Sequence, residues 1–201
     1  MHATLCDYLA DIVQNAIEAG AAHIQVEVTE TESIVSVTVT DNGKGMDAAT
    51  QARIWDPFYS EPGKHARRRV GLGLPLLRQA VEATGGELRF ASNPGAGTAI
   101  RFSLPARHLD TPPLGDLPGT LLGLLAHDHP YELAVTRVRN QEHYAISRAE
   151  LADVLGDLRE AGNLALARDF LRGQEDDLIQ TTHDDAAGIR PDARCKEPHQ
   201  P

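Results

Sequence analysis

The sequence has few cysteines, few aromatic side chains and no long apolar run. Two cysteines, Cys6 and Cys195, stand far apart among 201 residues, which does not favour a disulfide framework and fits a reducing cytoplasm. No apolar run approaches the ~20 residues that a membrane span needs, and the start of the chain does not resemble a signal peptide. We therefore expect a soluble, cytoplasmic protein with no membrane partner.

Basic residues are also in the minority. The formal net charge is −10 and the pI is near 5.3. A general nucleic-acid binder needs a basic face, so we expect no nucleic-acid partner. Aromatic residues make up only 4% of the chain, and the 41% hydrophobic fraction must therefore build its core mostly from Leu, Val, Ile and Ala.

Helical and strand periodicities follow one another in a definite order through the first hundred residues. The predicted helices are 4–19, 47–54 and 75–84, and the predicted strands are 24–28, 34–40, 88–91 and 98–104. Helices and antiparallel strand pairs are segregated, which indicates the α+β class. We expect a two-layer α/β sandwich with a mixed, mainly antiparallel sheet.

Composition divides the chain further. The first domain spans 1–105, and a Pro- and Gly-rich connector covers 106–119. Residues 120–172 predict a small C-terminal α/β appendage, in which a possible hairpin (131–138 and 142–147) lies among helical segments. The polar remainder, 173–201, is expected to be disordered.

Three separate segments carry the candidate chemistry. The first is Asp41 to Met46 at a strand end, where a carboxylate can accept a hydrogen bond from an exocyclic amine. Gly43 and Gly45 let the backbone approach a flat base without Cβ obstruction. The second is Asn15, whose carboxamide oxygen on a helix suits Mg²⁺, a cation that prefers oxygen ligands. The alternatives are a simple turn and a solvated helix face.

The third segment is Gly71 to Leu74. Its glycines expose backbone N–H groups just before a helix, which is a ready phosphate cradle, although a glycine-rich loop without ligand is the alternative. Leu76 occupies the place of the third glycine of a Rossmann fingerprint, and no P-loop is present. Lys64 and Arg67 to Arg69, in the preceding loop, could fold over a terminal phosphate and offset its charge, and solvated loop charges are the alternative.

Five motifs in sequence order resemble those of the GHKL superfamily, which includes gyrase, Hsp90, histidine kinases and MutL. The resembling segments, all within residues 4–104, are Asp11 to Ala21 (N box), Asp41 to Met46 (G1 box), Trp55 to Phe58 (F box), Gly71 to Leu74 (G2 box) and Gly95 to Thr98 (final box). The resemblance implies the Bergerat fold, an ATP site, a lid at about 59–70 and Mg²⁺ held through Asn15. It implies these ATP-binding residues: Asn15, Glu18, Asp41, Gly43, Gly45, Met46, Phe58, Lys64, Gly71, Leu72, Gly73, Leu74 and Thr98.

Two departures from the family pattern bear on activity. ATP-hydrolysing members place a Glu general base four residues before the Asn, and here that position is Asp11. The F and G2 boxes look most like those of sensor histidine kinases, yet only 14 residues precede Asn15, too few for a dimerisation hairpin. We therefore expect a protein partner in trans. Asp11 and Lys64 are the candidate catalytic residues.

The segment Asp110 to Asp116 extends the resemblance to small stand-alone ATP-binding proteins of this superfamily. Their gene neighbourhoods often contain redox complexes, so the partner is expected to be a redox or signalling complex. Three functions stay open at this point: a regulatory kinase or phosphotransferase acting in trans, a nucleotide-gated binding module with slow or no turnover, and an ATPase with Asp11 as base.

Overall fold

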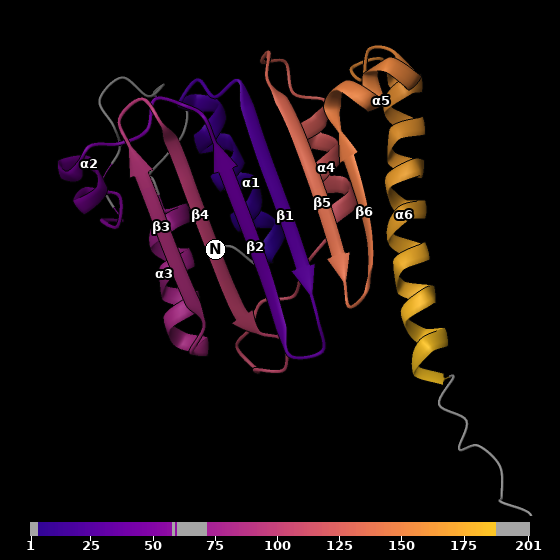
Figure 1. The fold of residues 1–201 in the computed structure, drawn as a ribbon, viewed down its shortest axis with the longest axis horizontal. Helices are drawn as coiled ribbons and strands as arrows, with labels where there is room; N and C mark the ends of the chain where they lie inside the picture. Colours follow the sequence, from indigo (N-terminus) through magenta and orange to yellow (C-terminus); the bar gives the residue numbers. More distant parts are fainter. Residues whose placement is uncertain (1–3, 58, 60–71, 188–201) are drawn as a thin grey trace, which may run out of the picture.

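A computed structural model describes residues 4–57, 59 and 72–187, the last seven of these for the backbone only. The chain order alternates short runs of helices and strands (Figure 1). The strands are β1 (His23–Glu30), β2 (Ile34–Asp41), β3 (Glu87–Asn93), β4 (Gly97–Pro105), β5 (Glu132–Arg139) and β6 (Glu142–Ser147). The helices are α1 (Leu5–Glu18), α2 (Ala48–Arg53), α3 (Gly73–Thr84), α4 (Leu117–Leu125), α5 (Arg148–Leu155) and α6 (Ala161–Ala187).

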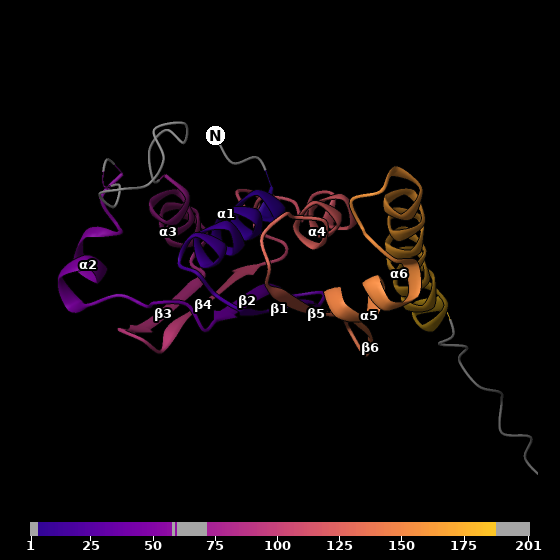
Figure 2. The ribbon, with the colours of Figure 1, turned by 90° about the horizontal axis from the view of Figure 1, so that it is seen from above.

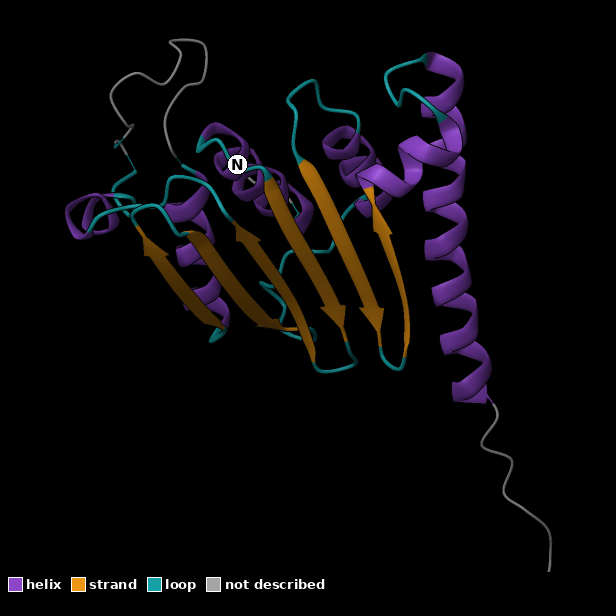
Figure 3. Cartoon of the chain, turned by 45° about the horizontal axis from the view of Figure 1, so that its top comes forward, coloured by secondary structure: helices purple, strands orange, loops and turns teal. Residues whose placement is uncertain are grey.

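All six strands join one open sheet in the order β3-β4-β2-β1-β5-β6. Four of the five neighbouring pairs are antiparallel, and β1 with β5 is the parallel pair. The loop after β2, the turn between β3 and β4 and the start of β1 lie at the same end of the sheet (Figure 3). The predicted two-layer α/β sandwich with a mixed, mainly antiparallel sheet is confirmed.

Helices α1, α3 and α4 cover one face of the sheet, and α6 stands along its β6 edge (Figure 2). Because polar and apolar residues alternate along the strands, most strand residues on the covered face are apolar. They form one core with α1, whose Leu9, Ile12 and Val13 are buried. On the opposite face, Gln25 and Thr40 are exposed. Within the described ranges, no helix combines the length and the apolar content needed to cross a bilayer.

Helix α1 is held firmly at its start. Thr4 and Asp7 form a capping box, in which the Thr4 hydroxyl accepts from the Asp7 N–H and the Asp7 carboxylate accepts from the Thr4 N–H. The N–H groups of Leu5 and Cys6 donate to the carbonyls of Pro113 and Leu114, at 2.9 and 3.0 Å. Four N–H groups at a helix start lack internal partners, so the 106–116 segment satisfies two of them.

The C-terminal part of the chain extends the same sheet. Strand β5 pairs with β1 over its whole length, from His23 opposite Glu132 to Glu30 opposite Arg139. The division into a 1–105 domain and a 120–172 appendage stays a prediction. Helix α4 starts at Leu117, inside the predicted connector, because the Asp116 carboxylate caps it through the Gly119 N–H.

The prediction of disorder from residue 173 is wrong for residues 173–187, which belong to α6. The helix is kept there by packing, since Leu171 and Leu178 are buried in the core. Composition alone indicated disorder because most of the remaining side chains of this stretch are polar. Residues 188–201 lie outside the described residues.

A buried polar cluster joins α6 to the sheet. The Arg137 side chain is 0% exposed and donates to Glu175 Oε1 at 3.1 Å and to Glu30 Oε2 at 2.5 Å. The Tyr144 hydroxyl donates to Glu175 Oε1 at 2.8 Å. Burial, with the Glu175 charge beside it, raises the pKa of Tyr144, so the phenol stays neutral. Every charge in this cluster is therefore paired, as burial demands.

Replacement of Arg137 by alanine is expected to lower the free energy of unfolding by about 3–5 kcal/mol, because Glu175 stays buried without its cation. Urea unfolding measures this. Arg139→Ala is the control, since Arg139 is 24% exposed and its contact with Glu30 is long, at 3.8 Å. It should cost about 1 kcal/mol or less. Equal losses for the two variants would contradict the role given to the buried cluster.

Candidate functional site

A polar row crosses three strands at one end of the helix-covered face. Asp41 on β2 lies opposite Thr98 on β4, which lies opposite Ser92 on β3. Directly opposite residues point to the same face of a sheet. The next row inward on these strands is apolar, with Val39, Ile100 and Phe90. The covered face therefore changes from apolar to polar at its last row.

The Asp41 carboxylate is half-buried and held in place by the backbone. Its Oδ1 accepts from the Gly43 N–H at 2.7 Å, and the Thr98 N–H also donates to the carboxylate. Burial raises the pKa of Asp41 above its ordinary value, and the two N–H bonds counteract part of that rise. An ionised carboxylate has about four acceptor positions, so it keeps capacity for a further donor.

The loop after Asp41 is fastened to the end of α1. Asn42 Oδ1 accepts from the N–H groups of Ala22 and His23, both at 2.9 Å. The Lys44 N–H donates to the Ala19 carbonyl at 3.0 Å. These bonds bring the Asp41 loop beside the last turn of α1.

Three glycines in this region have no room for a side chain. A Cβ at Gly43 would lie 3.0 Å from Asp41 Oδ1. Gly45 has φ +64°, and a Cβ there would lie 1.9 Å from the Asn93 carbonyl oxygen; Gly97 is equally crowded, with φ +81°. The chain around Asp41 is therefore packed backbone against backbone, which leaves a surface without side chains for a flat ligand.

Ser92 and Gln51, which sequence reasoning missed, lock this loop to the sheet edge. Ser92 Oγ accepts from the Met46 N–H at 2.9 Å. Gln51 Nε2 donates to the carbonyls of Met46 and Ser92, at 2.9 and 2.8 Å. Met46, a predicted site residue, thus lies in the same network as Thr98. Ser92 directly precedes the Asn93 to Gly97 turn, but no sequence signal assigned it a partner.

The polar stripe of α1 carries Asp11, Asn15 and Glu18 on one side of the helix. Asn15 and Glu18 are exposed, and Gln14 donates to Glu18 at 3.3 Å. The Asp11 carboxylate lies against the start of α3. A Cβ added at Gly73 would come within 2.6 Å of Asp11 Oδ2, which shows how closely the two residues approach. The structure thus brings together α1 and the first turn of α3.

The remaining predicted residues divide into two groups. Leu72 directly precedes α3, is 37% exposed and makes no capping hydrogen bond with its side chain. Leu74 packs against the core. Phe58, Lys64 and Gly71 lie outside the described residues, as do the three loop arginines.

An aromatic cluster flanks the row. The rings of Trp55 and Phe90 meet edge to face, with centroids 5.6 Å apart, and the Arg78 guanidinium lies 5.8 Å from the Trp55 ring. Arg53 stacks over Tyr59 at 4.3 Å. These contacts fix the segment after α2 against α3 and β3.

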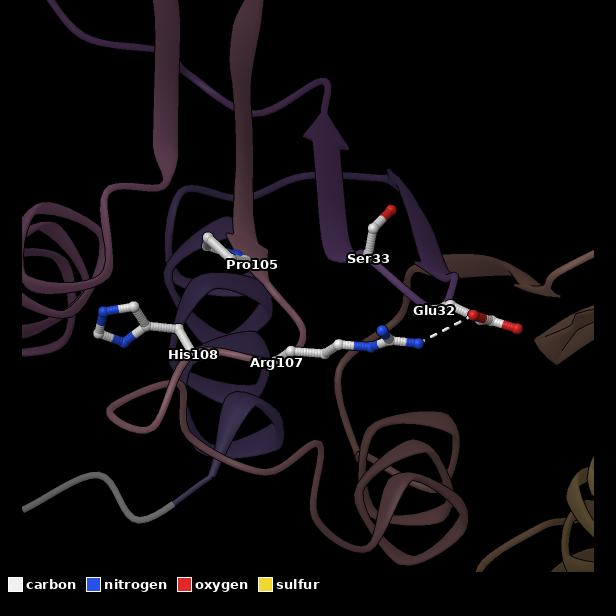
Figure 4. A pocket seen from close by; sticks show the side chains of 5 residues that line it. All are labelled: Glu32, Ser33, Pro105, Arg107 and His108. Atoms are coloured by element: carbon white, nitrogen blue, oxygen red, sulfur yellow. Dashed lines mark hydrogen bonds and ion pairs between the residues drawn. The ribbon is translucent and has the colours of Figure 1, made fainter.

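A surface hollow lies at the other end of the sheet, beside the turn between β1 and β2 (Figure 4). Its lining residues are Glu32, Ser33, Pro105, Arg107 and His108. The exposed Arg107 and Glu32 side chains pair there at 2.9 Å. None of the predicted site residues lines this hollow, so it is not the predicted site.

No group of three or more His, Cys, Asp or Glu side chains is arranged to hold a metal ion within the part of the chain that the structure describes. The predicted Mg²⁺ ligand, Asn15, is an amide on an exposed helix face. Such a ligand suits Mg²⁺ that is shared with substrate phosphates and water, rather than an all-protein cage.

Comparison with known proteins gives one family match and two kinds of relatives. Residues 3–108 match the family described as histidine kinase-, DNA gyrase B-, and HSP90-like ATPase. The chain is 33% identical over 110 residues to the non-motile and phage-resistance protein of Caulobacter vibrioides, covering 51% of this chain and 13% of that protein. It is 32% identical over 103 residues to the sensor histidine kinase WalK of Bacillus subtilis, covering 48% and 17%.

A solved structure with a similar fold is the N-terminal domain of a DNA repair protein. It is 13% identical, with a TM-score of 0.50, and the match covers 80% of this chain and 58% of that one. This likeness concerns the fold alone. The chain matches less than a fifth of the length of the two curated relatives named above, in each case with about half of its own residues.

Proposed function

The chain belongs to the histidine kinase-, DNA gyrase B- and HSP90-like ATPase family, since residues 3–108 match it, and from this we propose that its polar row belongs to a Mg-ATP site. The observation that carries the proposal is the Asp41 carboxylate. It is half-buried, fixed by two backbone N–H groups and surrounded by glycines that admit no Cβ.

The residues present fit an adenine ring. Asp41 keeps acceptor capacity for the exocyclic amine, and Thr98 stands next to it on β4. Gly43 and Gly45 offer backbone, not side chains, to the face of the base. Met46 is held beside them through Ser92. Together these groups would orient the base and keep water from its amine.

The residues on α1 and α3 fit the phosphates. The N-terminus of α3 offers N–H groups to an anion. Asp11 contacts Gly73 at the start of α3. Asn15 lies one helical turn, or about 6 Å, after Asp11 along α1. In this proposal the Asn15 amide oxygen holds Mg²⁺ and Gly71 to Leu74 hold the phosphates. Glu18 lies one turn further, and in this proposal Phe58 directly precedes the lid and Lys64 belongs to it.

We propose that the protein is a regulatory kinase or phosphotransferase whose phosphoacceptor is on a partner protein. The 32% identity to a sensor histidine kinase supports the kinase chemistry of this proposal. The terminal phosphoryl group of ATP would pass to the acceptor side chain and ADP would leave, and Lys64 with a bound Mg²⁺ would offset the charge. A redox or signalling complex is the proposed partner, and the cytoplasm the proposed location.

The second candidate function is a binding module with slow or no ATP turnover, in which bound ATP controls whether a surface is available to a partner. The contact between Asp11 and Gly73 favours it, because a carboxylate packed against α3 is poorly placed to activate water. Product analysis with labelled ATP separates the possibilities. Label on a co-purifying protein supports the kinase, and phosphate release that Asp11→Asn abolishes supports an ATPase. Partner binding that depends on the nucleotide, without either product, supports the gated module.

Asn15→Ala is expected to abolish the effect of Mg²⁺ on ATP affinity, because the amide oxygen is the proposed protein ligand. Calorimetry with Mg²⁺ and with EDTA measures this for the wild type and the variant. Gln14→Ala, one residue away on the same helix, should keep the full Mg²⁺ effect. A variant at Asn15 that binds ATP as the wild type does in both buffers would refute the metal assignment.

A further inference from the structure

Ser92 is the most tightly bound hydroxyl of the polar row. It is 7% exposed and has three hydrogen-bond partners at Oγ. The Met46 N–H lies at 2.9 Å, the Gly97 carbonyl oxygen at 3.0 Å and the Thr98 hydroxyl at 3.0 Å. Gln51 also donates to the Ser92 carbonyl, so both the side chain and the backbone of Ser92 are held in place.

The chemistry of these partners decides the direction of each hydrogen bond. A serine hydroxyl has one proton to donate and two lone pairs to accept with. The Met46 N–H can only donate, so Ser92 Oγ accepts there. The Gly97 carbonyl can only accept, so the Ser92 proton goes to it. The second lone pair of Ser92 must therefore accept the proton of Thr98.

Thr98 is left with acceptor capacity only, since its proton is committed to Ser92. Thr98 stands beside the Asp41 carboxylate, whose oxygens are also acceptors. Two neighbouring acceptors favour a ligand that carries two donor hydrogens at one position. The 6-amino group of adenine has this form, whereas the 6-oxo group of hypoxanthine or guanine presents an acceptor.

We propose that Ser92 is a specificity-determining residue that acts through Thr98: it fixes the Thr98 hydroxyl as an acceptor and so makes the site select 6-amino over 6-oxo purine nucleotides. This proposal rests on the proposed nucleotide site and assigns it a preference at one position of the base. Ser92 itself touches no ligand and is a positioning residue.

The test compares ADP with inosine 5′-diphosphate, which differ at the 6-position and the adjoining ring nitrogen. Calorimetry on the full chain with Mg²⁺ gives both affinities. The wild type should prefer ADP by about tenfold to a hundredfold. In Ser92→Ala the Thr98 hydroxyl is released and can donate to a 6-oxo group. The preference should then fall by about three- to tenfold, while Ser92→Thr, which restores a hydroxyl, should recover it.

A purely structural role for Ser92 would lower both affinities by the same factor and leave their ratio unchanged, and that result would overturn the inference. Ser103→Ala, which removes a β4 hydroxyl on the other face of the sheet, should leave the ratio at the wild-type value. If the Ser92→Ala variant no longer unfolds cooperatively, the same affinities are measured for Thr98→Val in its place. It should lower the preference, and an unchanged ratio would refute the proposal.

The two proposals fail separately. Wild-type protein that binds neither diphosphate would refute the nucleotide site, and the inference with it. Wild-type protein that binds both equally would keep the nucleotide site and overturn only the role of Ser92. In Thr98→Val, a further Ser92→Ala change should leave the ratio unaltered, because Ser92 acts through Thr98.

Discussion

Asp41→Ala is expected to weaken ATP binding by about a hundredfold or more. The change removes a charged acceptor for the base and leaves the N–H groups of Gly43 and Thr98 without their partner. A charge-assisted hydrogen bond contributes about 1.5–3 kcal/mol, and unsatisfied donors add to its loss. Since 1.4 kcal/mol is a factor of ten, about a hundredfold follows. Calorimetry with Mg-ATP measures the change.

Asp47→Ala is the matched control for Asp41. Asp47 is a carboxylate six residues further on, exposed, and occupied with capping α2 through the Thr50 N–H at 2.7 Å. Its removal should leave ATP affinity within twofold or so of the wild type, since surface changes away from special features have small effects. If the two variants lose affinity alike, net charge and not the geometry at Asp41 governs binding.

Gly45→Ala is expected to have the second large effect, on folding as well as binding. Gly45 combines a left-handed φ of +64° with a neighbour that a Cβ would approach to 1.9 Å, the carbonyl oxygen of Asn93. Backbone cannot swing away as a side-chain tip can. We expect a loss of about 4 kcal/mol or more in the free energy of unfolding, measured with urea, or no folded protein.

Gly95→Ala separates the two causes. Gly95 has a similar φ of +76°, but a Cβ there meets nothing within 4 Å. It should therefore cost only the left-handed conformation, about 1–2 kcal/mol. The difference between the two variants measures the close approach of the Gly45 loop to the β3–β4 turn. Equal costs would show that this loop is not packed as described.

Local signals predicted most of the elements. Apolar residues at helical spacing indicated a helix over 4–19, and the structure has α1 at Leu5–Glu18. Asp47 and Ser147 each cap a helix by accepting from an N–H three residues on, as capping rules expect of Asp and Ser. Gly85, which directly follows the predicted helix 75–84, has the left-handed φ of +68° that is typical of a helix end. These features depend on a few neighbouring residues, which is why periodicity and capping rules reach them.

Long-range features were beyond local rules. The parallel pairing of β1 with β5 joins segments about a hundred residues apart, and no periodicity states which strands are neighbours. Glu175 is buried because Arg137 and Tyr144 meet it, whereas its own sequence context is polar. The same limit explains the wrong prediction of disorder after residue 173. Tertiary packing there overrides composition.

The site residues also divide into those that local motifs predict and those that depend on long-range packing. Asp41 and Thr98 could be named from motifs, because each stands beside glycines that carry a signal of their own. Ser92 could not, since its importance comes from the register that sets it opposite Thr98 and from Met46, 46 residues away in the chain. Asp11 was predicted as a possible base, and its contact with Gly73 became visible only once α1 and α3 were packed together.

Calorimetric titration of the full chain with ATP, with and without Mg²⁺, tests the central claim most directly. We expect one saturable site per chain, with tighter binding in Mg²⁺ than in EDTA, and binding that Asp41→Ala abolishes or strongly weakens. No saturable binding, or binding that Asp41→Ala leaves unchanged, would contradict it.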